Sequence, residues 1–193
     1  MITPDSLMSL EQYSKARKEF RARVLVHKKH RTIQLGDHLT LVFEDELTMR
    51  YQVQEMLRVE RIFEEEGIRG ELEAYNPLVP DGSNWKATML IEYPDIEERK
   101  VALAQMIGIE DKVWVRIGGQ RKVFAIADED LDRENEEKTS AVHFLRFELD
   151  AAMKHELRSG EALALGVDHP AYSAVRDPAP AETRLSLLND LAF

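Results

Sequence analysis

The chain has no cysteine among its 193 residues, and this absence excludes several classes of protein. Disulfide bonds, thiol nucleophiles, Cys-ligated zinc and Cys-ligated iron–sulfur clusters all require that residue. The cofactor stays unknown, and any metal ion would have to be bound by carboxylate and histidine side chains.

Long hydrophobic runs and common catalytic motifs are also missing. The longest uncharged stretches fall well short of the about 18 residues that a membrane span needs. The N-terminus has no basic stretch followed by an apolar one, so we expect a cytoplasmic protein without a secretory signal. No Gly-x-Ser-x-Gly or Gly-x-Gly-x-x-Gly motif occurs, which argues against serine hydrolases and classical dinucleotide enzymes.

The residues that are present indicate a globular α+β protein. Hydrophobic residues make up 44% of the chain, and its length suffices to bury a core within one domain, residues 1–193. Helical periodicity dominates residues 9–76, short strands joined by hairpins or short helices dominate residues 85–170, and a tail helix covers about 181–191. We predict a mainly antiparallel sheet in the C-terminal half, packed against the N-terminal helical region.

Charge is unevenly distributed along the chain. The formal net charge is −10, whereas residues 15–31 carry eight Lys and Arg against one acid, Glu19. A basic helix of this kind could bind nucleic acid, but it lacks interleaved aromatic residues and a recognised motif. We therefore expect it to meet acidic residues of the same protein or of a partner, for example Glu44, Asp45, Glu46 or the run 64–66.

The predicted helix 46–66, ended by Gly67, carries unusually many polar groups. Its apolar arc of Met49, Val53, Met56, Val59 and Phe63 also includes Gln52 and Glu60. Buried carboxylates must be paired, protonated, metal-bound or at an edge. One interpretation is a ligand or metal site that includes Glu60. The other is a buried network of ion pairs and amides, or a subunit interface, supported by Gln52, Gln54, Glu55, Arg58 and Arg146.

Two histidines are further candidates for function. Alternation along strand 141–149 places His143 on the same face as Leu145, Phe147 and Leu149, which is typical of a core histidine. Asp168 and His169 directly follow the predicted strand 163–167, where a loop site could lie. Together with Glu60 they could form a carboxylate–histidine metal site, although no metal-binding spacing links them. The acidic stretch 128–137 begins like an EF-hand but lacks its glycine and final glutamate.

Four segments, residues 51–58, 75–82, 136–147 and 165–170, resemble an uncharacterised bacterial family, domain of unknown function 3501. The resemblance spans nearly the whole chain. It implies a setting in peroxide defence or redox metabolism, because members are encoded beside rubrerythrin-like proteins and iron–sulfur oxidoreductases. It assigns no catalytic residue, and without cysteine this chain cannot hold a Cys-ligated cluster itself.

Two functions follow as hypotheses. The first is a cytoplasmic accessory protein that binds a protein partner, for which the resemblance implies a redox system, or a second copy of itself. The second is a metal-binding protein or metal-dependent enzyme that uses Glu60, His143, Asp168 and His169. Nucleic-acid binding ranks last, and we expect no membrane association.

Overall fold

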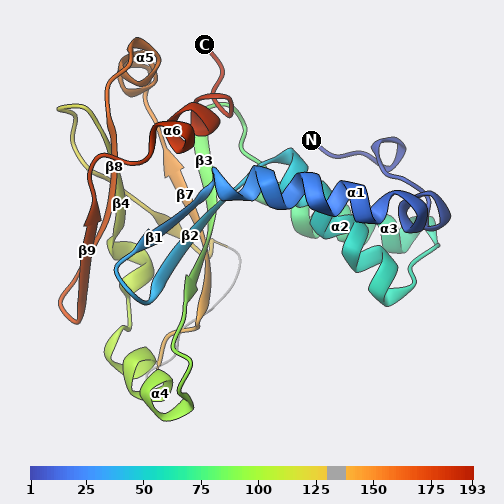
Figure 1. Cartoon of the computed structure of the whole chain (residues 1–193), viewed down its shortest axis with the longest axis horizontal. Helices are drawn as coiled ribbons and strands as arrows, with labels where there is room; N and C mark the ends of the chain where they lie inside the picture. The colour runs from blue at the N-terminus through green and yellow to red at the C-terminus, as the bar shows by residue number, and fades with distance from the viewer. Residues whose placement is uncertain (130–137) are drawn as a thin grey trace.

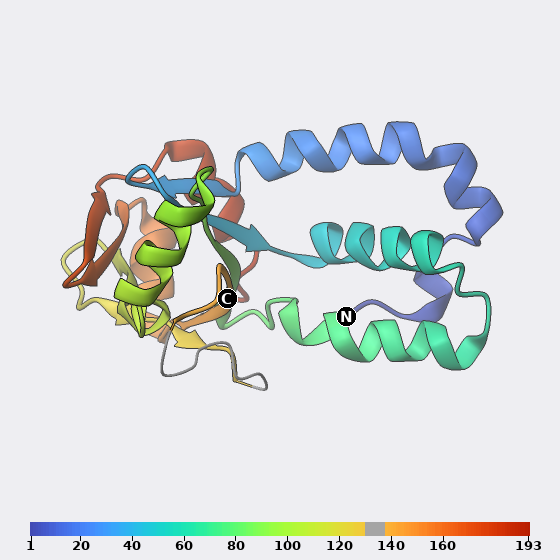
Figure 2. The ribbon, with the colours of Figure 1, turned by 90° about the horizontal axis from the view of Figure 1, so that it is seen from below.

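The structure is a computed structural model that describes residues 1–129 and 138–193. It has two regions (Figures 1 and 2). The first, which we call the helical arm, comprises residues 1–30 and 45–79 and projects from one end of the molecule. The second, the sheet body, contains two antiparallel sheets with three further helices. The predicted α+β class is therefore confirmed.

The helical arm is a layer of three helices, α1 (Leu10–Lys29), α2 (Glu46–Glu60) and α3 (Glu65–Tyr75), flanked by short 3-10 turns η1 (Pro4–Ser6) and η2 (Asn76–Leu78). Ser9 and Gln12 form a capping box that begins α1, because each side chain bonds the other residue's backbone N–H. Two small apolar clusters hold the layer together: one contains Ile2, Met49, Val53, Leu57 and Leu72, and the other Tyr13, Phe20 and Val24.

The prediction of a single helix over residues 46–66 is wrong about where that helix ends. The backbone of Arg61 turns into the left-handed region with φ 54°, so α2 ends at Glu60 and Gly67 lies inside α3. This turn lets α3 fold back on α2 and bury Leu72. As a result the predicted apolar arc also stops early, and Val59 and Phe63 are 60% and 69% exposed.

The first sheet has the strand order β1-β2-β3-β7-β6, with every neighbouring pair antiparallel. Its strands are β1 (Thr32–Leu35), β2 (Leu39–Glu44), β3 (Asn84–Ile91), β7 (Val142–Glu148) and β6 (Ile126–Ala127). The register aligns Leu41, Met89 and His143 in one row across the inner face, as alternation predicted for His143. Glu44, Lys86 and Arg146 form the corresponding row on the outer face.

The second sheet has the order β5-β4-β8-β9, and two predictions are corrected here. Its strands are β5 (Val123–Phe124), β4 (Val113–Ile117), β8 (Leu163–His169) and β9 (Tyr172–Arg176). The predicted strand 123–126 divides at Ala125, so that β5 pairs with β4 whereas β6 pairs with β7 of the first sheet. Asp168 and His169 lie in β8, paired with Ser173 and Tyr172 of the unpredicted β9, and not in a loop.

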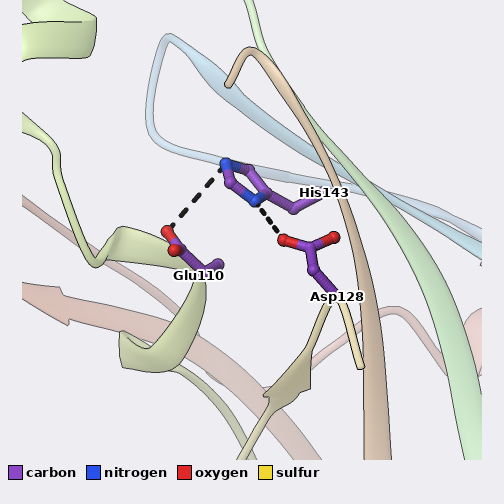
Figure 3. Close-up of side chains that lie close together, drawn as sticks. All are labelled: Glu110, Asp128 and His143. Atoms are coloured by element: carbon purple, nitrogen blue, oxygen red, sulfur yellow. Dashed lines mark hydrogen bonds and ion pairs between the residues drawn. The ribbon is translucent and has the colours of Figure 1, made fainter. Parts of the chain in front are cut away.

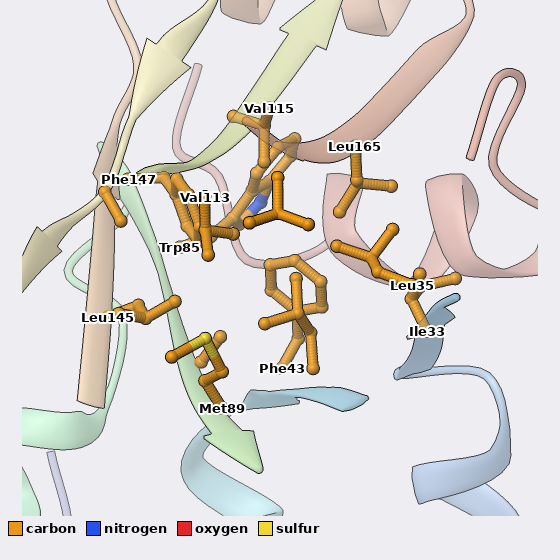
Figure 4. Close-up of a cluster of buried hydrophobic side chains, with 14 of the residues drawn as sticks. Ile33, Leu35, Phe43, Trp85, Met89, Val113, Val115, Leu145, Phe147 and Leu165 are labelled. Atoms are coloured by element: carbon orange, nitrogen blue, oxygen red, sulfur yellow. The ribbon is translucent and has the colours of Figure 1, made fainter. Parts of the chain in front are cut away.

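The main core fills the space between the two sheets. Figure 4 shows Phe43, Trp85 and Met89 of the first sheet facing Val113, Val115 and Leu165 of the second. Trp85 is fully buried, and its indole N–H donates to the carbonyl of Leu187 at 2.9 Å. Because aromatic and branched side chains from both sheets interdigitate, this layer supplies most of the buried apolar area of the body.

Three helices and one 3-10 turn complete the body: α4 (Ile96–Gln105), η3 (Ile109–Lys112), α5 (Ala151–Ser159) and α6 (Ala181–Leu188). Asp95 and Asp150 cap α4 and α5 as side-chain acceptors. The tail helix ends at Leu188, earlier than the predicted 191. Leu187 of α6 and Leu191 beyond it are buried, whereas Leu185, predicted on the apolar side, is 53% exposed. The predicted linker 177–180 packs on the body, since Ala179 N–H donates to the Leu163 carbonyl. No helix in the described parts of the chain is long and apolar enough to cross a membrane.

Candidate functional site

His143 lies at the centre of a buried polar cluster in the body (Figure 3). Its Nδ1 is 2.5 Å from Oδ2 of Asp128, which directly follows β6, and its Nε2 is 3.9 Å from Oε2 of Glu110 in η3. Nε2 also lies 2.8 Å from Thr139 Oγ1 and 2.9 Å from the Ser140 carbonyl. His143 is completely buried, and both carboxylates are nearly so.

The hydrogen bonds of this cluster define what the ring can do. A carbonyl oxygen only accepts, so Nε2 donates to Ser140, and Nδ1 faces the carboxylate of Asp128. The carboxylates of Asp128 and Glu110 both lie beside the ring, one near each nitrogen. The other oxygen of Asp128 accepts the Phe144 N–H at 2.8 Å. The cluster thereby ties η3, the end of β6 and β7 together.

The same residues form the one group of three potential metal ligands in residues 1–129 and 138–193, with ligand atoms within 4.8 Å of one another. One ion can bind only one ring nitrogen. At Nε2 it would have His143 and Glu110 as ligands and would displace the bond to Ser140, while Asp128 would orient the ring from Nδ1. The residues thus fit a metal ion only after rearrangement, and they form a satisfied network without one.

The other three predicted site residues do not join this group. Glu60 is the exposed last residue of α2, in the arm. Asp168 pairs with Lys122 at 2.7 Å, and this hydrogen bond is the main reason that the pKa of Asp168 is lowered. Trp114 lies flat against Gly166, where a Cβ atom would come within 2.3 Å of the indole ring. Lys122, which pairs with Asp168, lies over the ring of this tightly packed tryptophan.

His169 connects two turns. Its Nε2 donates to the Ile107 carbonyl at 2.9 Å, and its Nδ1 accepts from the Ala171 N–H at 3.1 Å. Both ring nitrogens are therefore engaged in holding the β8–β9 turn against the end of α4, which is a structural role.

The polar residues predicted on helix 46–66 form a network in the arm. Gln54 is fully buried and bonds both the N–H and the carbonyl of Met8. Glu55 accepts from Arg17 through both oxygens and from the Tyr13 hydroxyl at 2.6 Å, and Arg58 lies 3.7 Å away. The Arg17 hydrogen bond is the main reason that the pKa of Glu55 falls to about 2. Gln54 and Glu55 therefore fit the interpretation of a network of ion pairs and amides, whereas Gln52 is only half-buried.

The basic segment meets acidic residues of the same chain, in part those predicted. His27 lies 2.5 Å from Asp45, as expected, but Arg17 pairs with Glu55, and Glu65 pairs with Arg69 in its own helix. Arg31, at the end of the basic segment, is buried and only 1% exposed.

Arg31 lies where α1 of the arm continues into β1 of the body, and its guanidinium is 3.6 Å from the carboxylate of Asp45 in the arm. Its guanidinium donates to the carbonyls of Phe43 and Glu44, to Ser186 of α6 and to Asp190 at 2.5 Å. Burial raises the pKa of Asp190 to about 6, and Arg31 acts in the opposite direction. Sequence reasoning missed this role because Asp190 is distant in the chain.

A cleft of about 360 Å³ lies between the arm and the outer face of the first sheet. Ala74, Pro77 and Leu78 form its apolar wall on the arm, opposite Phe144 of β7. Lys86, Arg146 and Glu129 supply charged groups, and Asp128 reaches the cleft from the His143 cluster. Alternation along strands 84–91 and 142–148 could have placed Lys86 and Arg146 each on the outer face of its strand, but the opposing wall comes from a distant helix. The part of the acidic stretch at 130–137 lies outside the described residues.

These features define an α+β protein with a buried Glu–His–Asp cluster beside an open cleft. The chain matches the family described as "Protein of unknown function (DUF3501)" over residues 1–191, and it belongs to that family. It is similar to the crystal structure of a novel protein of unknown function from Burkholderia pseudomallei, with 53% identity, 99% of each chain covered and a TM-score of 0.93. No curated protein matches it.

Proposed function

We propose that this chain is an accessory protein that binds an acidic protein partner through the outer face of α1. The observation that carries the proposal is a mixed apolar and basic surface on the arm. Leu25 and Val26 are 49% and 57% exposed, and Lys18, Arg21 and Lys29 surround them on the face that points away from α2. Within the described residues, none of these three cations forms an ion pair.

The charge distribution supports an acidic partner. The rest of the chain is strongly acidic, so the basic face of α1 is a local positive patch that would attract and orient a negatively charged protein as the two approach. Exposed apolar side chains at the centre of a charged rim are typical of protein interfaces. The family resemblance favours a rubrerythrin-like protein or an iron–sulfur oxidoreductase as the partner. Such a partner would carry the electrons, because this chain has no cysteine for a cluster.

The test is binding to those two proteins from the source organism, measured by calorimetry at low and high salt. We expect binding that weakens with salt and that falls at least about tenfold in the double variant Lys18→Glu, Arg21→Glu. The matched control is Lys112→Glu, Arg176→Glu on the body, which should bind normally. If neither protein binds and light scattering shows a monomer, the proposal is wrong. A dimer that the arm variant dissociates would identify a second copy as the partner.

A metal ion at His143 and Glu110 is the second candidate, because these ligand atoms lie 3.9 Å apart and Asp128 orients the ring. Elemental analysis of untagged protein tests it, with His143→Gln as the variant and His155→Gln as an exposed histidine control. We expect metal in the parent protein and in the control but not in His143→Gln. Less than about one tenth of an ion per chain, without tight rebinding, contradicts this candidate.

A further inference from the structure

The cleft between the arm and the first sheet has the features of a small-molecule site. Its volume of about 360 Å³ falls in the range of small-ligand pockets, which are mostly apolar with a few placed polar groups. Leu78 and Phe144 face it from opposite sides, and Pro77 and Ala74 extend the apolar wall. The cleft is independent of the α1 surface discussed above, since it is bounded by α3, η2 and strands β3 and β7.

Two cations, Lys86 and Arg146, line the cleft, and two nearby carboxylates are paired with Arg146. Arg146 binds Glu129 through two parallel hydrogen bonds of 2.7 and 2.8 Å, and it also bonds Glu148. Glu148 in addition accepts from Asn84 at 2.9 Å. Such bidentate pairs hold a carboxylate in a fixed position. Glu129 and Glu148 are therefore already engaged by Arg146.

Lys86 is the second cation of the cleft. It is half-buried between Glu44 and Arg146 in the outer row of the sheet, and in the described parts of the chain its ammonium group has no hydrogen bond or ion pair. Glu44, its neighbour on β2, instead accepts from Thr88. Burial and then the charge of Arg146 lower the pKa of Lys86. Lys86 is half-buried, and the described carboxylates of the cleft make no direct ion pair with it, so it favours an anionic ligand.

We propose that this cleft binds a small monocarboxylate with a compact apolar body, whose carboxylate pairs with Lys86 and whose apolar part lies between Leu78 and Phe144. A single negative charge fits better than two, because Glu73, Asp128 and Glu129 also line the cleft and would repel a dianion such as phosphate. The volume accommodates a ligand the size of benzoate or hexanoate.

The test uses benzoate and hexanoate as probes, with benzamide and hexanamide as neutral analogues and inorganic phosphate as a dianion. Binding is followed by calorimetry and by amide chemical shifts of the full chain. We expect both carboxylates to bind at least about tenfold more tightly than the amides. The shifts should concentrate at residues 74–78, 86 and 144–146.

The variant Lys86→Met keeps the apolar stem of the side chain and removes its charge. It should weaken carboxylate binding at least about tenfold but leave amide binding unchanged, and Lys86→Arg should retain carboxylate binding. Lys112→Met, at an exposed lysine of η3, is the matched control and should bind like the parent protein. Circular dichroism and thermal melting establish that each variant is folded.

Several results would overturn the proposal. These are an absence of binding by the parent protein, equal affinity for the carboxylates and the amides, carboxylate affinity unchanged in folded Lys86→Met, or phosphate binding as tightly as benzoate. Acylation of Lys86 by an amine-reactive reagent, read by peptide mass, gives an independent measurement: benzoate should protect Lys86 and leave Lys112 reactive.

Discussion

The arm and the body are stabilised in different ways. The body buries a continuous apolar layer between two sheets, whereas the arm divides its apolar contacts between two small clusters and adds the buried Gln54 and the partly buried Glu55. Apolar burial gains free energy in proportion to area, while a buried polar group must first recover its desolvation cost and gains only about 0.5–1.5 kcal/mol per hydrogen bond. We infer that the body supplies most of the stability and that the arm depends on specific hydrogen bonds.

The largest effect is expected in the body. Phe147→Ala removes a fully buried ring from the core between the sheets and should lower the free energy of unfolding by about 3–5 kcal/mol. Urea titration followed by the fluorescence of Trp85 and Trp114 measures it, because both indoles are buried in the body. Phe124→Ala, at a ring that is 44% exposed, is the control and should cost less than about 1 kcal/mol. Equal losses would show that the core between the sheets is not the main source of stability.

The next largest loss of stability is expected at Arg31, at the junction of the arm and the body. Arg31→Met leaves the Asp190 carboxylate and two carbonyls without their donor, and we expect a loss of about 3 kcal/mol. The pKa of Asp190 should rise above its value of about 6, because Arg31 opposes the effect of burial. Asp190→Asn combined with Arg31→Met should cost less than the two single losses added together. Additive losses in this cycle would contradict direct coupling.

A cavity in the arm should cost less and act more locally. Leu57→Ala opens the cluster between α2 and α3, and we expect about 2 kcal/mol, the low end for such changes, because a thin layer can relax around the gap. Hydrogen exchange should accelerate for amides of α2 and α3 and change little in β3 and β7. Uniform acceleration throughout the chain would instead mean that arm and body open only together.

The smallest effect depends on pH. Arg17 lowers the pKa of Glu55 from 4.5 to about 2, so the stability that Glu55 contributes is complete above pH 4.5 and disappears as the pH falls through about 2. Glu55→Gln should therefore be less stable than the parent by about 1–2 kcal/mol at pH 7, with the difference shrinking toward pH 2. Urea titrations across this range measure it. Glu11→Gln, at an exposed side chain, should show a difference that does not change with pH.

Local sequence patterns predicted much of the fold. Alternation placed His143 on the buried face of β7, and the capping box of Ser9 and Gln12 marked the start of α1. Both features depend on residues close together in the chain. The end of α2 was predicted wrongly because Arg61 adopts the left-handed conformation usually reserved for glycine, which Gly67 seemed better suited to supply.

The candidate site was much less predictable. His143 was identified as a candidate, but its partners Glu110 and Asp128 were not. Of the expected partners, Glu60 is exposed in the arm, and Asp168 and His169 have other contacts. Glu110 gave no signal because it lies on a short turn with no periodicity. Lys86 was missed because an isolated lysine on a strand normally points to solvent, and only the placement of α3 and η2 opposite it encloses the cleft.

The sequence by itself determined the α+β class, most of the helices and strands, the buried face of β7 and the exclusion of cysteine chemistry, since each depends on composition or on neighbours a few residues apart. Tertiary structure decided the change of sheet at Ala125, the convergence on His143, the Arg31 junction and the cleft at Lys86. Those features require groups distant in the chain to meet. Strand register and helix packing across the whole molecule bring them together, and no local pattern encodes them.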